Sequence, residues 1–304
     1  MKNFIKHQLP LTLFNKPKTL DLLLFDYLYL KFISKKLTNN DILRFHEDGF
    51  FKTDFNLKKE VEQIQKIIEK QNPIKSEKNV FEFEINKNLK SIIKDILKIN
   101  FSDKINLLKH YYNQNIYIDN IYIKRNYSVK NSLHNDYNRE KKDEYFNNYF
   151  HLDANTINYF KLFINLQDVT DRHGPLNLYS KSDTKKFVKL SNYKSRLAYN
   201  PNFLIEGLNI NSGPQGDSLF CQTTQCLHRA SVPEVGLYRD MLFVSFVAVN
   251  SKDFNDDLFY FEKLNENFWK HSGASTYCSK YSKPKSFKEM AKLYFYLSKN
   301  KNKD

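Results

Sequence analysis

The chain has 304 residues, of which 15% are aromatic, and only 7 are Gly and 8 are Pro. This composition excludes a disordered or fibrous protein, because such chains lack the large apolar side chains that offset the entropy lost on ordering. The formal net charge of +14 would suit a nucleic-acid partner. However, arginine stands at only seven positions, while Lys, Asn and Ile are abundant throughout. Codon bias in a genome rich in A and T explains that pattern better, so no nucleic-acid partner is expected.

The first 37 residues are expected to form a helical extension. Their most apolar stretch, LDLLLFDYLYLKFI, is interrupted by Asp21, Asp26 and Lys31, well short of the ~20 apolar residues that a transmembrane helix needs. The N-terminus also lacks the pattern of a secretory signal. We therefore expect no transmembrane segment and a helix that packs on the body, with a peripheral role at a membrane surface as the alternative.

Two helices are predicted next. LTNNDILRFHEDGFF (37–51) has a possible cap at Thr38, Asn39 or Asn40 and ends at Gly49, as a helix followed by a C′ glycine would. NLKKEVEQIQKIIEKQ (56–71) has apolar residues at helical spacing, namely Val61, Ile64, Ile67 and Ile68. The first hundred residues are therefore expected to be mostly helical and to cover one face of the remaining body of the protein.

From about residue 116 the apolar period changes to two, which predicts strands. The predicted strands are NIYIDNIYIKRNYSV, NYFKLFINLQDV, DSLFCQTTQCLHRAS and RDMLFVSFVAVN. Five of the seven glycines lie between 174 and 236, at sites typical of turns. Short strands without helix-length segments between them predict an antiparallel sandwich or barrel. Residues 251–304 are expected to form a helical segment and a basic tail.

A histidine and an acid stand just ahead of the second predicted strand. His151 and Asp153 are two residues apart, so both project from one face of a strand. Together with a second histidine they would form the two-histidine, one-carboxylate triad that binds iron(II) and leaves three positions open. His228, 77 residues further on, is the best candidate, because it ends the strand DSLFCQTTQCLHRAS after a glycine turn. Arg239, eleven residues later, opens a strand, where burial would be costly unless it met an anion such as a dicarboxylate co-substrate.

Two rival metal sites remain as alternatives. His134 and Asp136 form a second His-x-Asp pair, but it lies in a charged, loop-like run that is more typical of a surface or a substrate mouth. Cys221 and Cys226 near His228 could suggest zinc, but structural zinc needs two close ligand pairs. Cys278 has no partner beside it. Buried thiols in a reducing cytoplasm are therefore the expected state of the cysteines.

The ordered set resembles a known family. His-x-Asp, then FKLFINLQDVTDRHGPL, then GDSLF and LHRAS, then Arg239 is similar to the phytanoyl-CoA dioxygenase-like branch of the iron(II)/2-oxoglutarate oxygenases. The resemblance covers roughly residues 38–250 and includes the helix and turn at 37–51. It departs at LNLYSKSDTKKF, where the family commonly has a Gly-Ser-His turn and this chain has Ser182 and Asp183.

The resemblance implies a fold and a reaction. The core would be a double-stranded β-helix, a jelly roll of the cupin kind, with flanking helices. His151, Asp153 and His228 would bind Fe(II), and Arg239 would bind 2-oxoglutarate. The enzyme would use O2 to hydroxylate a C–H bond of a small-molecule or carrier-linked substrate. Related halogenases have a small residue in place of the carboxylate, so Asp153 favours hydroxylation.

Other side chains and functions stay open. Arg229 is expected to face away from the site in an ion pair, and His173 to be a turn residue. Lys124 and Arg125 end a strand, either solvated or near an anionic substrate, and Tyr122 and Asn165 are candidates to line the interior. The alternative functions are a non-catalytic cupin-like binding protein and a nucleic-acid-associated oxygenase. No sequence pattern predicts an oligomeric state.

Overall fold

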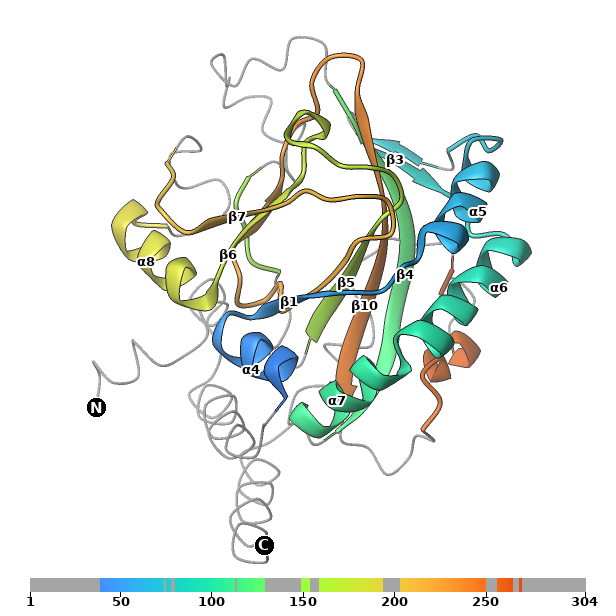
Figure 1. Ribbon diagram of the computed structural model, residues 1–304, viewed down its shortest axis with the longest axis horizontal. Coiled ribbons are helices and arrows are strands. Elements are labelled where there is room, and N and C mark those ends of the chain that lie inside the picture. The colour runs from blue at the N-terminus through green and yellow to red at the C-terminus, as the bar shows by residue number, and fades with distance from the viewer. Residues whose placement is uncertain are drawn as a thin grey trace, which may run out of the picture.

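The computed structural model describes residues 39–73, 75–77, 80–112, 114–128, 149–153, 159–193, 203–249, 256–264 and 268–269. Two antiparallel sheets form the centre of this part of the chain (Figure 1). The larger sheet has the strand order β1-β8-β5-β10-β4-β3-β2, and the smaller has the order β7-β6-β9. The strands are β1 Phe50–Thr53, β2 Lys75–Glu77, β3 Val80–Phe83, β4 Asn115–Tyr127, β5 Tyr159–Asn165, β6 Leu176–Tyr179, β7 Leu208–Asn211, β8 Ser218–Cys221, β9 His228–Ala230 and β10 Tyr238–Val249.

The order of these strands defines a jelly roll. After β4, the chain passes to the smaller sheet, where His151 bridges His228 of β9, and returns as β5. It then crosses to β6 and β7, back to β8, over to β9 and back to β10. Two sheets that share the chain in this alternating way form a double-stranded β-helix. The predicted fold class is therefore confirmed.

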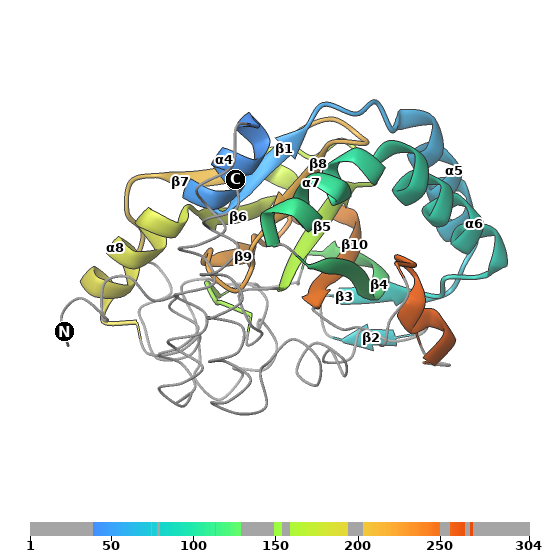
Figure 2. The same cartoon turned by 90° about the horizontal axis from the view of Figure 1, so that it is seen from below.

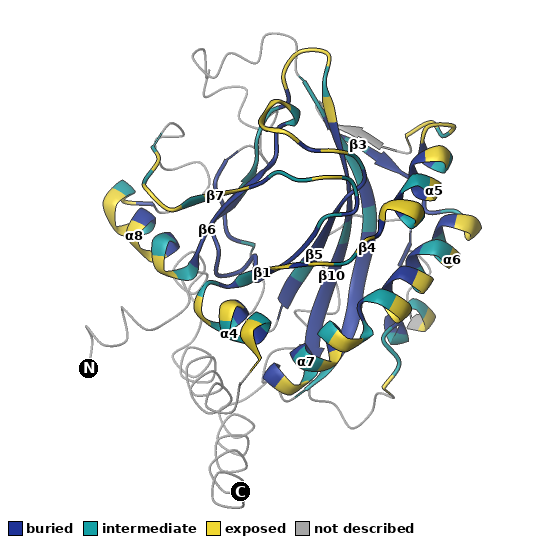
Figure 3. Ribbon diagram, in the orientation of Figure 1, coloured by how far each residue is buried: buried dark blue, intermediate teal, exposed yellow. Residues whose placement is uncertain are grey.

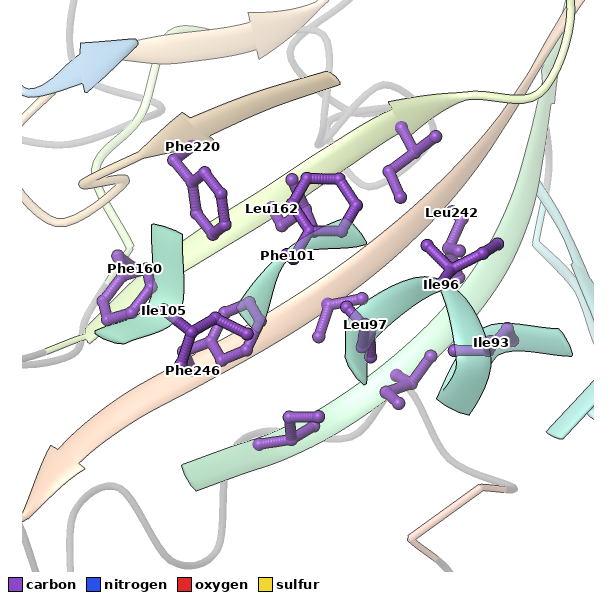
Figure 4. Packing of buried hydrophobic residues seen from close by; sticks show 14 of the residues in the cluster. Ile93, Ile96, Leu97, Phe101, Ile105, Phe160, Leu162, Phe220, Leu242 and Phe246 are labelled. Carbon is purple, nitrogen blue, oxygen red and sulfur yellow. The ribbon is translucent and has the colours of Figure 1, made fainter. Parts of the chain in front are cut away.

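Helices cover the outer face of the larger sheet (Figures 1 and 2). They are α4 Asn40–Glu47, α5 Lys58–Ile68, α6 Lys87–Asp95, the π-helical turn η2 Ile96–Asn100 and α7 Ser102–Tyr112. Their apolar sides are buried and their polar sides exposed (Figure 3). Helix residues such as Ile93, Leu97 and Phe101 pack against Leu162 of β5 and Leu242 of β10 in one large cluster (Figure 4). This cluster joins the helices to one side of the sheet, and the opposite side faces the smaller sheet.

The two helices predicted at the start of this region are confirmed. Asn39 caps α4, since its side chain accepts hydrogen bonds from the backbone N–H groups of Asp41 and Ile42. Gly49 follows the helix with φ of 90°, a conformation that favours glycine. Helix α5 buries Val61 and other members of its predicted apolar stripe.

The secondary structure differs from the prediction in three places. The first hundred residues also contain the short strands β1, β2 and β3, so they are less helical than predicted. A helix, α8 Lys181–Ser191, interrupts the strand region, because Ser180 accepts a hydrogen bond from the backbone N–H of Asp183 and caps it. The predicted strand 217–231 is two strands, β8 and β9, which belong to different sheets because the chain turns at 222–227.

The described residues beyond 250 pack on the same core. The 3-10 helix η5 Tyr260–Leu264 contributes Phe261, and Phe259, Phe268 and Trp269 are buried in the cluster beneath the sheet. None of the helices in the described ranges is long and apolar enough to cross a membrane. The predicted helix within residues 1–37, the pair His134 and Asp136, and Cys278 lie outside the described residues.

Candidate metal centre

His151, Asp153 and His228 come together at the edge of the smaller sheet. His151 and His228 exchange two backbone hydrogen bonds of 3.0 Å, and their ring centroids are 4.3 Å apart. The backbone N–H of Asp153 donates to the carbonyl of Thr223 at 2.9 Å. His228 begins β9 instead of ending a strand as predicted, because the turn before it moves the chain between sheets. Its pairing with Leu178, an interior residue of β6, turns the His228 ring toward the larger sheet.

The three side chains are spaced to hold one ion. Each histidine Nε2 lies 4.0 Å from Oδ1 of Asp153, within the ~4.2 Å that is the greatest separation two ligands of one ion can have at bonds of about 2.1 Å. All three ligand atoms lie within 4.8 Å of one another. In the part of the chain that the structure describes, this is the single group of His, Cys, Asp or Glu with such spacing. The predicted triad is brought together.

Backbone carbonyls set the tautomer of both imidazoles. Nδ1 of His151 lies 2.8 Å from the carbonyl oxygen of Tyr149, and Nδ1 of His228 lies 3.0 Å from that of Cys226. A carbonyl oxygen only accepts, so each Nδ1 must carry the proton and donate. Each Nε2 then carries the lone pair that a metal needs, which is the arrangement found around metal-ligating histidines.

Lys161 holds the other oxygen of the carboxylate. Its Nζ lies 2.7 Å from Oδ2 of Asp153, and both side chains are mostly buried. Burial acts to raise the pKa of Asp153, but Lys161, His228 and His151 together hold that pKa far below its ordinary value. Burial acts to lower the pKa of Lys161, but Asp153 and Tyr122 raise it above its ordinary value. The carboxylate is therefore ionised and oriented, with Oδ1 toward the two imidazoles.

Arg239 lies further along the same interior. It is 1% exposed, its Nη1 donates to the carbonyl of Gly174, and its Nε has no hydrogen-bond partner among the described residues. Burial lowers its pKa to about 10, so it remains charged near neutral pH. Arg239 contacts Gly174, and His228 pairs with Leu178. Gly174 and Leu178 are four residues apart in the chain, so their Cα atoms lie at most about 14 Å apart. A small dicarboxylate and the side chains at its two ends can span that length.

Asn165 supplies a second polar group near Arg239. It is 1% exposed, and both its amide nitrogen and its amide oxygen lack hydrogen-bond partners within the described ranges. Asn165 pairs with Met241 of β10 and lies two residues from Phe163, and both of these neighbours belong to the cluster between the sheets. Alternation along the strands therefore puts Asn165 and Arg239 on the interior face. Their unmet hydrogen-bonding capacity favours a polar ligand there.

Several other predicted residues are placed by the structure. His173 is a turn residue, as predicted, in the 3-10 turn η4 Asp171–His173, where it bonds Thr170. The guanidinium of Arg229 packs 4.5 Å from the ring centre of Phe150, away from the triad as predicted, and its ion pair stays a prediction. Tyr122 faces the interior and stacks on Phe243, with centroids 4.9 Å apart.

The two basic residues at the end of β4 have different surroundings. Lys124 lies 3.9 Å from Glu82 and 4.7 Å from the ring centre of Tyr122. Arg125 forms two hydrogen bonds of 2.8 Å with the fully buried Asp240. Arg125 therefore neutralises a carboxylate that β10 buries beside it, a role that neither interpretation from the sequence, a solvated strand end or a substrate contact, included.

Zinc binding by the cysteines finds no support. Cys221 and Cys226 are free thiols in the cluster between the sheets, and neither belongs to the group of side chains spaced for a metal. Sequence reasoning missed Lys161, although one signal was present. It is a lone cation in an apolar strand, two and four residues from Phe163 and Asn165, and so lies on their face.

No family model and no curated protein matches this sequence. Among solved structures, the chain is similar to HygX from Streptomyces hygroscopicus with nickel and 2-oxoglutarate bound, with 12% identity, a TM-score of 0.48, and coverage of 72% of this chain and 89% of that one. It is also similar to EctD from S. alaskensis with 2-oxoglutarate and 5-hydroxyectoine, with 14% identity, a TM-score of 0.46, and coverage of 70% of this chain and 77% of that one. A third similar structure is the non-heme alpha-ketoglutarate-dependent epimerase SnoN from nogalamycin biosynthesis, with 9% identity, a TM-score of 0.45, and coverage of 69% of this chain and 81% of that one. These likenesses are distant, and the jelly roll is established by this chain's own strand order.

Proposed function

We propose that the chain is an Fe(II)- and 2-oxoglutarate-dependent dioxygenase that hydroxylates a C–H bond of a small-molecule or carrier-linked substrate. The observation that carries the proposal is the orientation of the triad, in which two imidazole Nε2 atoms face one oxygen of a buried, ionised carboxylate. The motif order along residues 38–250 supports the phytanoyl-CoA dioxygenase-like branch as the specific family. The free thiols Cys221 and Cys226 are compatible with a reducing cytoplasm.

The donor set fits iron(II). Two imidazole nitrogens and one carboxylate oxygen on one face are the ligands of non-heme iron(II) oxygenases, and they leave the opposite positions open. Zinc in a structural site would need a fourth protein ligand, and the described residues offer a group of three. His151, Asp153 and His228 would therefore hold the iron.

The interior also fits a dicarboxylate co-substrate. A fully buried guanidinium without a carboxylate partner is costly, and Arg239 keeps an unused Nε–H donor. One carboxylate of 2-oxoglutarate would satisfy Arg239, and Asn165 could donate to the same group through its unpaired amide nitrogen. We assign both residues to co-substrate binding.

When bound, iron would supply the oxidative chemistry, in which decarboxylation of 2-oxoglutarate to succinate and CO2 with O2 would accompany hydroxylation of the substrate C–H bond. The chain's own residues bind and orient the reactants. Asp153 occupies the position that related halogenases leave to a small residue, so we propose hydroxylation as the outcome. The apolar side chains between the sheets, Phe163, Leu178 and Met241 among them, keep bulk water from the co-substrate.

Succinate formation tests this function without knowledge of the substrate. Purified protein is incubated with Fe(II), ascorbate, 2-oxoglutarate and O2, and slow uncoupled succinate release is followed by NMR. We expect succinate from the parent, none from His228→Ala, and a requirement for far more 2-oxoglutarate in Arg239→Met. Arg172→Met is the matched control, since Arg172 pairs with Glu234 on the surface, and should behave as the parent. Metal-loaded, folded parent that binds 2-oxoglutarate but releases no succinate would favour the binding-protein alternative.

A further inference from the structure

Lys161 is a mostly buried cation in direct contact with the proposed metal centre. It projects from β5 into the interior, where its Nζ is 2.7 Å from Oδ2 of Asp153 and also hydrogen-bonds Tyr122. Its side chain is 13% exposed and that of Asp153 is 15% exposed. An ion pair this deep is screened little by solvent, so its geometry constrains both partners.

The contact divides the two oxygens of the carboxylate. Oδ2 faces Lys161, and Oδ1 lies 4.0 Å from the Nε2 atoms of His151 and His228. The backbone N–H of Asp153 donates to the carbonyl of Thr223, which fixes the backbone from which the carboxylate projects. A carboxylate held in this way offers one oxygen to an ion, which leaves more positions open than a carboxylate that binds through both.

The contact also changes the charge of the centre. Asp153 is the one acid in the metal group, and Lys161 neutralises it. An ion entering the centre therefore meets two imidazoles and a carboxylate that already has a cation beside it. At distances of a few ångströms in a buried site, one unit of charge changes binding strongly.

We infer that Lys161 is a positioning residue of the metal centre: it holds Asp153 as a one-oxygen ligand and limits the affinity of the centre for divalent metal. In the metal-free protein, Lys161 is the counter-ion that keeps the carboxylate in place. The inference rests on the proposed function only in that the triad binds a divalent ion. It assigns to this chain a residue that the His-x-Asp and histidine motif does not include.

Co(II) titration under anaerobic conditions tests the inference without turnover. The visible bands of bound Co(II) report both affinity and coordination number. Lys161→Met removes charge and hydrogen bond together, Lys161→Gln keeps a donor for Oδ2 without the charge, and Lys161→Arg keeps both. Lys186→Met is the matched control, since Lys186 pairs with Asp183 of α8 instead of a metal ligand.

The expected results separate charge from orientation. Lys161→Met and Lys161→Gln should bind Co(II) on the order of tenfold more tightly than the parent. Only Lys161→Met should change the band shape, as Asp153 turns to bind through both oxygens, and it should bind 2-oxoglutarate on the order of tenfold more weakly in the Co(II) form. Lys161→Arg and Lys186→Met should match the parent in all three readouts.

Two results would overturn the inference, and a different one would overturn the proposed function. Unchanged Co(II) affinity and spectrum in Lys161→Met would show that Lys161 only fills space. If Lys161→Met does not fold, an unchanged Co(II) affinity in Lys161→Gln would also overturn the inference. A folded parent that binds no Co(II) would instead remove the metal centre itself, and with it the proposed oxygenase.

Discussion

The two faces of the larger sheet use the same strands for different purposes. On the outer face of β10, Leu242, Val244 and Phe246 pack under the helices, and Phe160 of β5 stacks on Phe246 with centroids 5.1 Å apart. On the inner face the same two strands present polar side chains, including Lys161 of β5, and two groups with unmet hydrogen bonds, Asn165 and Arg239. The outer face is packed without a ligand, whereas a ligand would satisfy the unmet hydrogen bonds of the inner face. Changes outside should therefore affect stability, and changes inside should affect binding.

Loss of a metal ligand should give the largest effect. His228→Ala removes one of two imidazoles from the triad, and we expect its Fe(II) affinity to fall by more than about a hundredfold, because even residues behind the ligands contribute 10–100-fold. Isothermal titration under anaerobic conditions measures the affinity. The thermal unfolding temperature of the metal-free protein is the control, and His228→Ala should change it little. An unfolded variant would contradict the expectation that inner-face changes affect binding and not stability.

Truncation of an outer-face ring should affect folding instead. Phe160 is fully buried between Tyr112 and Phe246, with centroids 5.6 and 5.1 Å away. Phe160→Ala should lower the free energy of unfolding by about 3–5 kcal/mol, the usual cost of removing a buried ring. Urea denaturation checks this value. The folded fraction should bind Fe(II) like the parent, and a tenfold change in that affinity would contradict the division between the faces.

Arg239→Met, unlike Phe160→Ala, should weaken ligand binding without lowering stability. We expect the dissociation constant of 2-oxoglutarate to rise about 10–150-fold, since charge-assisted hydrogen bonds contribute about 1.5–3 kcal/mol. The stability of the protein without co-substrate should stay the same or rise, because burial of Arg239 already lowers its pKa to about 10 and an apolar replacement relieves that cost. Co-substrate titration and urea denaturation, run side by side, measure both. Strong destabilisation would mean that Arg239 is structural.

His46 gives a smaller, pH-dependent effect in the helical layer. Burial, and then the charge of Lys181, lower the pKa of His46 to about 4. As the pH falls from 6.5 to 4, the unfolded chain gains a proton at His46 that the folded protein does not, so stability is lost over this range. After allowance for its partial exposure the loss is about 1–2 kcal/mol. His46→Gln, measured beside the parent at pH 6.5 and 4, should reduce the difference by that amount, and identical differences would show that His46 contributes nothing.

Period-two patterns predicted the inner face of the strands and separated Arg229 from His228. The pair His151 and Asp153 was found from the same spacing, although His151 forms an isolated bridge and Asp153 lies outside any strand. The helix α8 was not predictable, since its buried residues Thr184 and Phe187 are too few to show a clear stripe. The change of sheet between β8 and β9 was hidden for another reason. The turn at 222–225 contains no Gly or Pro, and it is closed by backbone hydrogen bonds from Gln225 and Cys226 to Gln222. Lys161 was missed because its importance depends on its contact with Asp153, which lies eight residues earlier and outside β5, so alternation within β5 does not predict the contact.

The triad and Arg239 are proposed to form one site for iron(II) and 2-oxoglutarate. The most direct measurement is an anaerobic titration of the metal-free protein with Fe(II) and 2-oxoglutarate, following the weak visible charge-transfer band of the complex. We expect a band in the parent, no band in His228→Ala, and a band in Arg239→Met only at much higher 2-oxoglutarate. Folded, iron-loaded parent without any band at saturating 2-oxoglutarate would contradict a shared site for the metal and the co-substrate.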